Sequence, residues 1–291
     1  MRLERECNRN DSASRKEVGV SSSYRRLCAG AGLLNTYTSY SLISRDLDKS
    51  LERVEKQPTV QREAQYYLEN IEKVKSIEDF LKDDRLFKFA MKAHGLKDMD
   101  YAKAFMKKAM VEGIDSRDSF ANKLSDKRYA DFVDTFNFER YGETATVFTK
   151  ARQGTVDKYV RQTLEEDAGA QNEGVRLALY FSRKAPDITN FYEVLADPAL
   201  SKVMRTALGL PESLAAADID KQVQLFESKL DIEDLQDPKK LEKFMTRFTS
   251  LWEISNPSAS AGVASVSVLF GQPAEYGIST NTLFAIQSLR R

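Results

Sequence analysis

The residues of this chain that could carry acid–base or metal chemistry are few, and they do not stand together. The 291 residues include one histidine, His94, and two cysteines, Cys7 and Cys28. A single histidine removes most metal sites and the usual pairings of a nucleophile with a histidine base. Because both cysteines precede residue 30, we expect neither a disulfide framework nor a cysteine-built zinc site in the rest of the chain.

Carboxylates stand close together in sequence at three places: Asp83 and Asp84, residues 165–167, and residues 231–237. Neighbouring residues diverge around a helix, so such groups are poorly placed to act as an acid–base pair. Residues 231–237 also lack the glycine and the distal glutamate of a calcium loop. Phosphate-binding loops, dinucleotide fingerprints and nucleophile elbows are absent from the sequence. We therefore expect no catalytic residue, no metal, no cofactor and no enzymatic activity.

The strongest pattern in the chain is a repeat. Residues 81–96 return as residues 195–210, 114 positions later, with seven of the sixteen residues identical. Average composition would give about one match. His94 takes the place that Leu208 has in the second copy, which favours a packed residue at a helix end over a ligand. The repeat predicts two related helical units, and it describes architecture rather than a reaction.

Each unit contains two helix starts of one form, Leu-x-Asp followed by an amphipathic run. An aspartate there accepts a hydrogen bond from a first-turn N–H and faces the positive end of the helix, which stabilises the helix by about 1 kcal/mol. Gly95 and Gly209 follow their helices where a left-handed C′ glycine is expected. The predicted N-caps are Asp83, Asp126, Asp197 and Asp237.

The composition favours helix, because only 13 glycines and seven prolines interrupt the chain. The predicted fold is all-α, with two related multi-helix units (an internal duplication) joined by a longer helical segment and flanked by amphipathic terminal helices. The predicted segments are a disordered leader without a cleavable secretory signal (1–30), N-terminal amphipathic helices (31–75), a first repeat unit (76–142), linking helices (143–186), a second repeat unit (187–253), and a small-residue segment with a C-terminal helix (254–291).

Charge and hydropathy narrow the choice of partners. Lys plus Arg equals Asp plus Glu at 44 each, which does not favour nucleic acid. No apolar run is long enough to span a membrane as a helix. Apolar stripes at 39–56 and 280–289 predict amphipathic helices that could bind a protein partner or a second copy of the chain. The candidate interaction residues are Leu42, Leu47, Leu51, Leu283, Phe284, Ile286 and Leu289.

Four stretches carry a resemblance to a known family: residues 33–48 (LLNTYTSYSLISRDLD), 56–69, 76–81 and 277–289 (GISTNTLFAIQSL). They resemble an uncharacterised all-helical family of alphaproteobacteria whose genes tend to lie among flagellar genes. The resemblance covers about residues 31–291 and brings no catalytic residues with it. It implies a role linked to the flagellum and motility, in the cytoplasm or on the flagellum itself.

Three hypotheses follow. The first is a non-enzymatic helical interaction or assembly protein that binds flagellar components through its ends or through a groove between the repeats. The second is a cytoplasmic export chaperone or regulator of flagellar secretion. The third is an enzyme with a carboxylate-based site between the repeats, which requires a cleft lined by several convergent polar groups.

Overall fold

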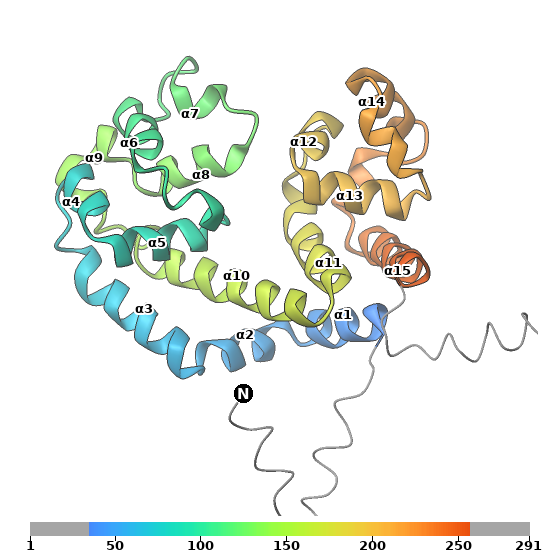
Figure 1. Ribbon diagram of the computed structural model, residues 1–291, viewed down its shortest axis with the longest axis horizontal. Coiled ribbons are helices and arrows are strands. Elements are labelled where there is room, and N and C mark those ends of the chain that lie inside the picture. Colours follow the sequence, from blue (N-terminus) through green and yellow to red (C-terminus); the bar gives the residue numbers. More distant parts are fainter. Residues whose placement is uncertain (1–34, 257–291) are drawn as a thin grey trace, which may run out of the picture. The chain divides into compact units, whose positions relative to one another are not determined.

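The structure is a computed structural model that describes residues 35–256. These residues form helices and contain no strand, which confirms the predicted all-α class for this part of the chain (Figure 1). The predicted leader and the residues from 257 onwards lie outside it. The helices before residue 150 are α1 (Thr36–Arg45), α2 (Leu47–Glu55), α3 (Pro58–Ile71), α4 (Ile77–Lys82), α5 (Asp84–Ala93), α6 (Lys103–Glu112), α7 (Phe120–Lys123), α8 (Lys127–Thr135) and α9 (Phe138–Tyr141). Those after it are α10 (Gln153–Gln171), α11 (Glu173–Lys184), α12 (Phe191–Ala196), α13 (Pro198–Ala207), α14 (Ile219–Glu227) and α15 (Pro238–Ser255).

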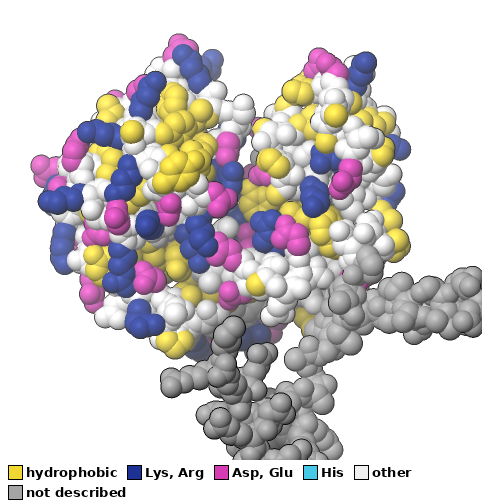
Figure 2. All heavy atoms as spheres, viewed as in Figure 1, with side chains coloured by type: hydrophobic (Ala, Val, Ile, Leu, Met, Phe, Trp, Pro, Cys, Tyr) yellow, Lys and Arg dark blue, Asp and Glu magenta, His cyan; other side chains and the backbone are white. Residues whose placement is uncertain are grey.

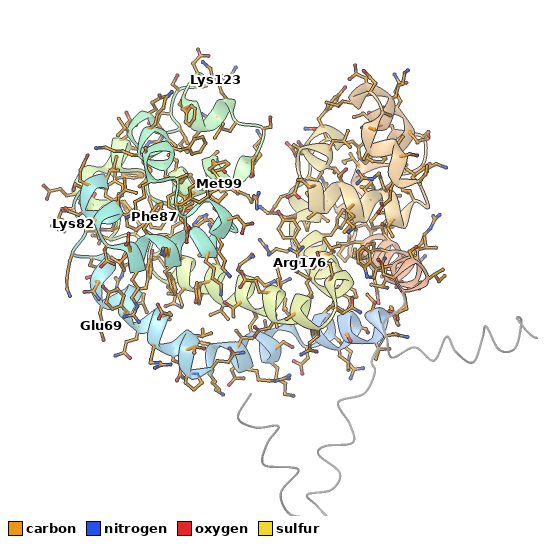
Figure 3. The ribbon with its side chains drawn as sticks, viewed as in Figure 1. Glu69, Lys82, Phe87, Met99, Lys123 and Arg176 are labelled. Atoms are coloured by element: carbon orange, nitrogen blue, oxygen red, sulfur yellow. The ribbon has the colours of Figure 1, made fainter. Side chains whose placement is uncertain are left out.

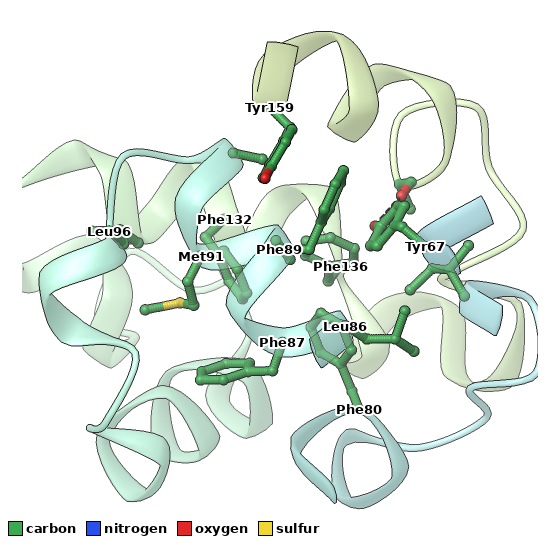
Figure 4. Close-up of a cluster of buried hydrophobic side chains, with 14 of the residues drawn as sticks. Tyr67, Phe80, Leu86, Phe87, Phe89, Met91, Leu96, Phe132, Phe136 and Tyr159 are labelled. Carbon is green, nitrogen blue, oxygen red and sulfur yellow. Dashed lines mark hydrogen bonds between the residues drawn. The ribbon is translucent and has the colours of Figure 1, made fainter. Parts of the chain in front are cut away.

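Helices α2 to α10 surround a first hydrophobic cluster that is rich in aromatic rings (Figure 4). The buried ring of Phe80 lies 4.9 Å from that of Phe136, measured between centroids. Phe89 stacks between Tyr67 and Tyr159, at 4.4 and 4.0 Å. Each such ring buries roughly 150–250 Å², so aromatic packing supplies much of the stability of this cluster.

Helices α11 to α15 surround a second hydrophobic cluster. The ring of Phe181 lies 5.3 Å from that of Phe244, and Phe191 meets Phe226 edge to face at 5.9 Å. The second cluster also takes in Tyr40 of α1, whose hydroxyl shares a 2.7 Å hydrogen bond with a serine of α11. The N-terminal helices therefore contribute to both clusters.

The two clusters are joined along α10 and α11. Helix α10 packs against α2, α3 and α5, whereas α11 packs against α1, α13 and α15. Figure 1 shows α1, α2 and α3 following one another beside α10 and α11. The start of α1 is fixed to the end of α15, because the backbone N–H of Thr36 donates to the Glu253 carboxylate at 3.0 Å.

The predicted single helix over 39–56 is two helices in the structure. The helical path breaks at Asp46, where the backbone has φ −131° and ψ 59°. The break directs Tyr40 into the second cluster and Val54 into the first. The change of direction therefore coincides with the passage of the chain from one cluster to the other, and Ile43 of α1, just before it, packs against both.

The linking helices also differ from the prediction. The polar composition of residues 165–173 predicts a break in the helix after Leu164, but α10 continues to Gln171. The helix persists because the Glu165 carboxylate is buried and neutralised by arginines, as described below. Asn172 then ends α10 and caps α11 by accepting from the N–H of Gly174 at 2.8 Å.

The two copies of the repeated sequence have matching local geometry. Asp83 caps α5 and Asp197 caps α13, each by accepting from two first-turn N–H groups. Each helix then ends at a glycine with positive φ, 72° at Gly95 and 67° at Gly209. In both, the residue after the glycine donates its N–H to the carbonyl five residues earlier, which is the Schellman arrangement. The duplication itself stays a prediction from the sequence.

The contact of α11 with α15 predicts a costly glycine substitution. A Cβ added at Gly174 would overlap the indole ring of Trp252. We expect Gly174→Ala to lower the free energy of unfolding by about 1–3 kcal/mol, although alanine normally favours a helix. Urea unfolding followed by circular dichroism measures the change. The control is Gly169→Ala in α10, where a Cβ would meet Arg176 at 2.7 Å from Cδ and 3.1 Å from Cβ, so the arginine side chain can shift and the loss should be smaller than at Gly174. Equal effects at both sites would contradict the predicted clash.

Candidate functional site

The predicted N-cap aspartates lie at the starts of α5, α8, α13 and α15. In each, one carboxylate oxygen accepts a hydrogen bond of 2.8–3.0 Å from the N–H two residues further on. These carboxylates satisfy first-turn donors that would otherwise lack a partner. They are Asp83, Asp126, Asp197 and Asp237.

His94 is packed inside the first cluster. Its side chain follows α5 and lies edge to face with Phe132 at 5.2 Å between ring centroids. Its Nε2 has no hydrogen-bond partner among residues 35–256. Burial, together with the charge of nearby Lys158, holds the pKa of His94 well below its usual value. A neutral, enclosed imidazole fits the predicted packing role.

The carboxylates at 165–167 point to three different sets of partners. Glu165 accepts from Arg161 and Arg183, and Glu166 lies 3.1 Å from Nζ of a lysine on α5. Asp167 accepts from a glutamine side chain at 2.9 Å. They therefore do not form an acid–base pair.

A cleft of about 380 Å³ opens between α8 and the α11–α13 part of the chain. Figure 2 shows the hollow from one side, between the surface over α7 and α8 and the surface over α12 to α14. Residues from both repeat segments line it, so it corresponds to the predicted groove between the repeats. Its charged lining residues are Asp126, Lys127, Arg128, Asp131, Lys184, Asp187, Glu193 and Asp197.

The cleft continues into a more apolar part of about 700 Å³ over α12, α13 and α14. Ser125, Lys127 and Glu193 line both parts, so the two are continuous. The apolar wall includes Tyr192 and Ile219, which are 52% and 58% exposed. Large apolar side chains with such exposure, beside charged groups, are typical of a surface that another molecule covers.

Arg128 forms part of the floor of the cleft. It donates to Asp126 at 2.7 Å and to the carbonyl of Gly95 at 2.7 Å, which ties the start of α8 to the end of α5. Burial opposes its charge, but the hydrogen bonds and the charge of Asp126, taken together with more distant groups, more than offset this and raise the pKa of the Arg128 guanidinium. Tyr180 and Asp197 of the second half add to this effect, so Arg128 is a point of attraction between the two halves.

A second hollow, of about 420 Å³, shares Arg128, Tyr180 and Asp197 with the cleft. Its lining includes Arg176 of α11, which is labelled in Figure 3, and Glu166 of α10. The three shared residues thus form a partition between two hollows. The space between the halves is divided by polar contacts and is not one open channel.

The Tyr180–Asp197 hydrogen bond belongs to the scaffold of the repeat. The Tyr180 hydroxyl donates to Asp197 at 2.5 Å. The same bond occurs in the first copy, where the Tyr66 hydroxyl donates to Asp83 at 2.8 Å, and both of these residues lie 114 positions before their equivalents. Burial and the Asp197 carboxylate raise the pKa of Tyr180. The Tyr66 pair lies outside the cleft, so this arrangement by itself indicates a structural contact. Lys184 also lines the cleft, but the residue 114 positions earlier is Asn70, so this cation is not part of the repeated arrangement.

The hydrogen bond between Tyr180 and Asp197 predicts that two cap substitutions lower the free energy of unfolding by different amounts. We expect Asp197→Ala to lower the free energy of unfolding by about 2 kcal/mol, because it removes a cap and leaves the Tyr180 hydroxyl without its acceptor. Asp237→Ala removes only a cap and should cost about 1 kcal/mol. Urea denaturation of both variants, with Tyr180→Phe as the control, measures the difference. Equal losses would show that the tyrosine bond adds nothing.

Lys158 of α10 is a partly buried cation near the cleft. Its Nζ lies 3.4 Å from the Thr135 hydroxyl, and it forms no ion pair with the described residues. Burial lowers the pKa of Lys158 to about 8; Asp131 opposes this shift, whereas Lys150 and Lys184 add to it. Burial of Lys158 therefore lowers the stability of the folded chain whenever its amine is charged.

The depressed pKa of Lys158 predicts a pH-dependent gain from its removal. Between about 8 and the ordinary value of 10.5, the unfolded chain binds the proton that the folded chain has lost, so stability rises with pH in this window. Below about 8 the full cost is present. Lys158→Met should therefore add about 1 kcal/mol at pH 7, with allowance for solvent screening, and nothing at pH 10.5.

Urea denaturation of the Lys158→Met variant and the wild type from pH 7 to 10.5 measures this gain. The control is Lys107→Met, because Lys107 is half exposed, paired with Glu78 at 2.7 Å and not among the groups that shift the pKa of Lys158. It should give no gain at pH 7. A gain from Lys158→Met that does not change with pH would contradict the assignment.

The candidate interaction residues of α1 and α2 differ in exposure. Leu42 is 54% exposed, whereas Leu47 and Leu51 are partly buried against the first cluster. Leu47 and Leu51 are therefore part of the folded body, and removal of residues 39–56 would unfold part of it. The remaining candidates, Leu283, Phe284, Ile286 and Leu289, lie outside the described residues.

Residues 35–256 contain no group of three or more His, Cys, Asp or Glu side chains placed to hold a metal ion. Within that range no helix has the length and apolar character needed to cross a membrane.

Comparison with known proteins assigns the family. Residues 93–241 match the family described as "Protein of unknown function (DUF1217)". The chain belongs to the DUF1217 family. A crystal structure of a protein from Agrobacterium tumefaciens is 50% identical, covers 84% of this chain and 99% of its own, and superposes with a TM-score of 0.71. No curated protein matches the chain.

The DUF1217 match confirms the predicted likeness to an uncharacterised family, and Agrobacterium is an alphaproteobacterium. The matched region runs from the end of α5 into α15. It contains every residue that lines the cleft, from Ser125 to Gln222. The cleft is therefore a feature of the DUF1217 region, whereas α1 to α4 precede it.

Proposed function

We propose that this DUF1217 protein is a non-enzymatic interaction protein that binds a protein segment in the cleft between α8 and α12–α14. The observation that carries the proposal is the pairing of an exposed apolar wall, at Tyr192 and Ile219, with a charged wall at Lys127, Asp131 and Lys184. An amphipathic segment presents both kinds of surface at once. A small substrate would need a more enclosed site.

The polar groups of the cleft favour binding over catalysis. Asp126 is bonded to Arg128, and Asp197 caps a helix and accepts from Tyr180. These carboxylates are held by structural partners, which leaves them poorly disposed to move protons during a reaction.

The hypothesis of a carboxylate-based enzyme keeps its required cleft. Glu193 accepts from Thr189 at the start of α12, which leaves the exposed Asp187 as the lining carboxylate without a structural partner among residues 35–256.

We further propose that the bound segment belongs to the flagellum. This part of the proposal rests on the resemblance of residues 33–48 and 277–289 to a family whose genes tend to lie among flagellar genes. Both an assembly protein and an export chaperone would use such a cleft. Presence of the protein in purified hooks or filaments would favour assembly, and its absence there would favour a chaperone.

Two isoleucines allow a matched test of the binding surface. Ile219 lies in the cleft and is 58% exposed, whereas Ile254 lies near the end of α15 and is 77% exposed. Ile219→Glu should abolish complementation of a deletion strain in swimming assays, because a charge replaces part of the apolar wall. Ile254→Glu should leave swimming unchanged.

Both variants should fold, since both side chains are exposed, and circular dichroism melting checks this. If only Ile254→Glu abolished swimming, the binding surface would lie near the chain ends and not in the cleft. Full swimming with Ile219→Glu would reject the cleft as the functional surface.

A further inference from the structure

We propose that residues 280–291 of the same chain occupy the cleft and compete with its partner. The occupancy is inferred from the described surface and from the sequence of this segment. The competition rests on the proposed function. Such occupancy requires a surface with exposed apolar and acidic groups, a segment that complements both, and a connection long enough to bring them together.

The cleft offers more negative than positive charge. Asp126, Asp131, Asp187, Glu193 and Asp197 line its charged part, against Lys127, Arg128 and Lys184.

Two carboxylates of the cleft have no cation beside them in the described part of the chain. Asp187 and Glu193 form no ion pair with any residue in the range 35–256, and Glu193 accepts hydrogen bonds only from the uncharged Thr189. Glu193 also lines the apolar part, beside Tyr192 and Ile219. An occupant of this cleft would therefore place apolar side chains next to cations.

Residues 280–291 have this composition. Leu283, Ile286 and Leu289 recur every three residues, a spacing typical of one helix face, and two arginines follow directly. The segment contains no acidic residue. Its apolar side chains complement the wall at Ile219, and its two arginines complement the carboxylates at Asp187 and Glu193.

The connection is long enough for this contact within one chain. The described chain ends at Asn256, directly after α15, and residues 257–279 lead to the segment. A chain of ~23 residues can span up to about 75 Å. A folded unit the size of residues 35–256 has a radius of gyration of about 17 Å, so every face of it is within reach.

Tethering makes even a weak contact effective. A linked segment meets its site at an effective concentration on the order of 1 mM. An intrinsic Kd of about 100 µM would then fill the cleft about nine-tenths of the time. The affinity of any competing segment would fall about tenfold, which is the expected size of the regulation.

Disulfide trapping in the full chain tests the occupancy. With Cys7→Ser and Cys28→Ser as background, Ile219→Cys is combined with Phe284→Cys and oxidised at low micromolar concentration. We expect a cross-link within one chain, detected by mass spectrometry of the monomer band. The controls are Ile254→Cys with Phe284→Cys and Ile219→Cys with Phe270→Cys. Equal cross-linking in the controls, or cross-linking only between two chains, would overturn the proposal.

A labelled peptide of residues 278–291 gives a second, independent reading. Its Kd for the full chain should fall about tenfold when Leu283→Ser and Phe284→Ser weaken the competing segment. The matched control is Leu269→Ser with Phe270→Ser, which has the same residue types in the connection and should change nothing. An unchanged Kd in both variants would overturn the proposal.

These measurements contain no external partner. Their failure would leave binding of a partner in the cleft intact, whereas full swimming with Ile219→Glu would reject partner binding and leave the occupancy by residues 280–291 standing.

Discussion

The arrangement of the two hydrophobic clusters depends on one buried carboxylate. Glu165 of α10 accepts from Arg183 of α11 at 2.8 and 2.9 Å, one bond to each oxygen, and from Arg161 at 3.0 Å. Its side chain is 2% exposed, and removal of both arginines would leave this buried charge without a partner, whereas breaking even one buried ion pair typically costs about 3–5 kcal/mol. Arg183 in turn lies over the ring of Tyr180, which is bonded to Asp197 at the start of α13. Contacts therefore run without interruption from the first cluster to the second.

The shape of the cleft follows from this connection. Its walls come from α8 in the first half and α11–α14 in the second, and each wall is held by the core of its own half. Within residues 35–256, the N-terminal pair α1 and α2 contributes to both halves, with Tyr40 in one cluster and Val54 in the other. A surface between two packed cores can be precise without loops of its own, because helix packing sets the spacing of its walls.

The sequence predicted best what is encoded locally. A cap such as Asp83 or Asp197 depends on two or three following residues, and a stop such as Gly95 depends on one backbone angle, so short patterns contain the whole signal. The residues that line the cleft could not be predicted from the sequence. Lys127 and Glu193 look like ordinary solvated side chains in their own helices, and only the fold brings them together.

Neutralisation of Glu165 by an arginine distant in the sequence explains why the predicted helix break at residues 165–173 was wrong. Residues 165–173 have the composition of an exposed break, and nothing nearby in the sequence reveals that Arg183, eighteen positions after Glu165, would bury that carboxylate. The break at Asp46 has a similar origin, because it serves two clusters that form only in the folded chain. In both cases tertiary contacts override the local pattern.

The two ends of the described chain leave the fold side by side. Thr36 at the start of α1 donates to Glu253 in the last turn of α15, and Asn172, at the turn between α10 and α11, donates to the Thr36 hydroxyl at 2.9 Å. A pulling force transmitted through the flanking segments would thus enter and leave at one point, and the α1–α15 contact would bear it. The cleft, formed by α8 and α12–α14, lies off that line of force. The protein could be held under tension in a mechanical assembly while the spacing of its cleft walls stays the same.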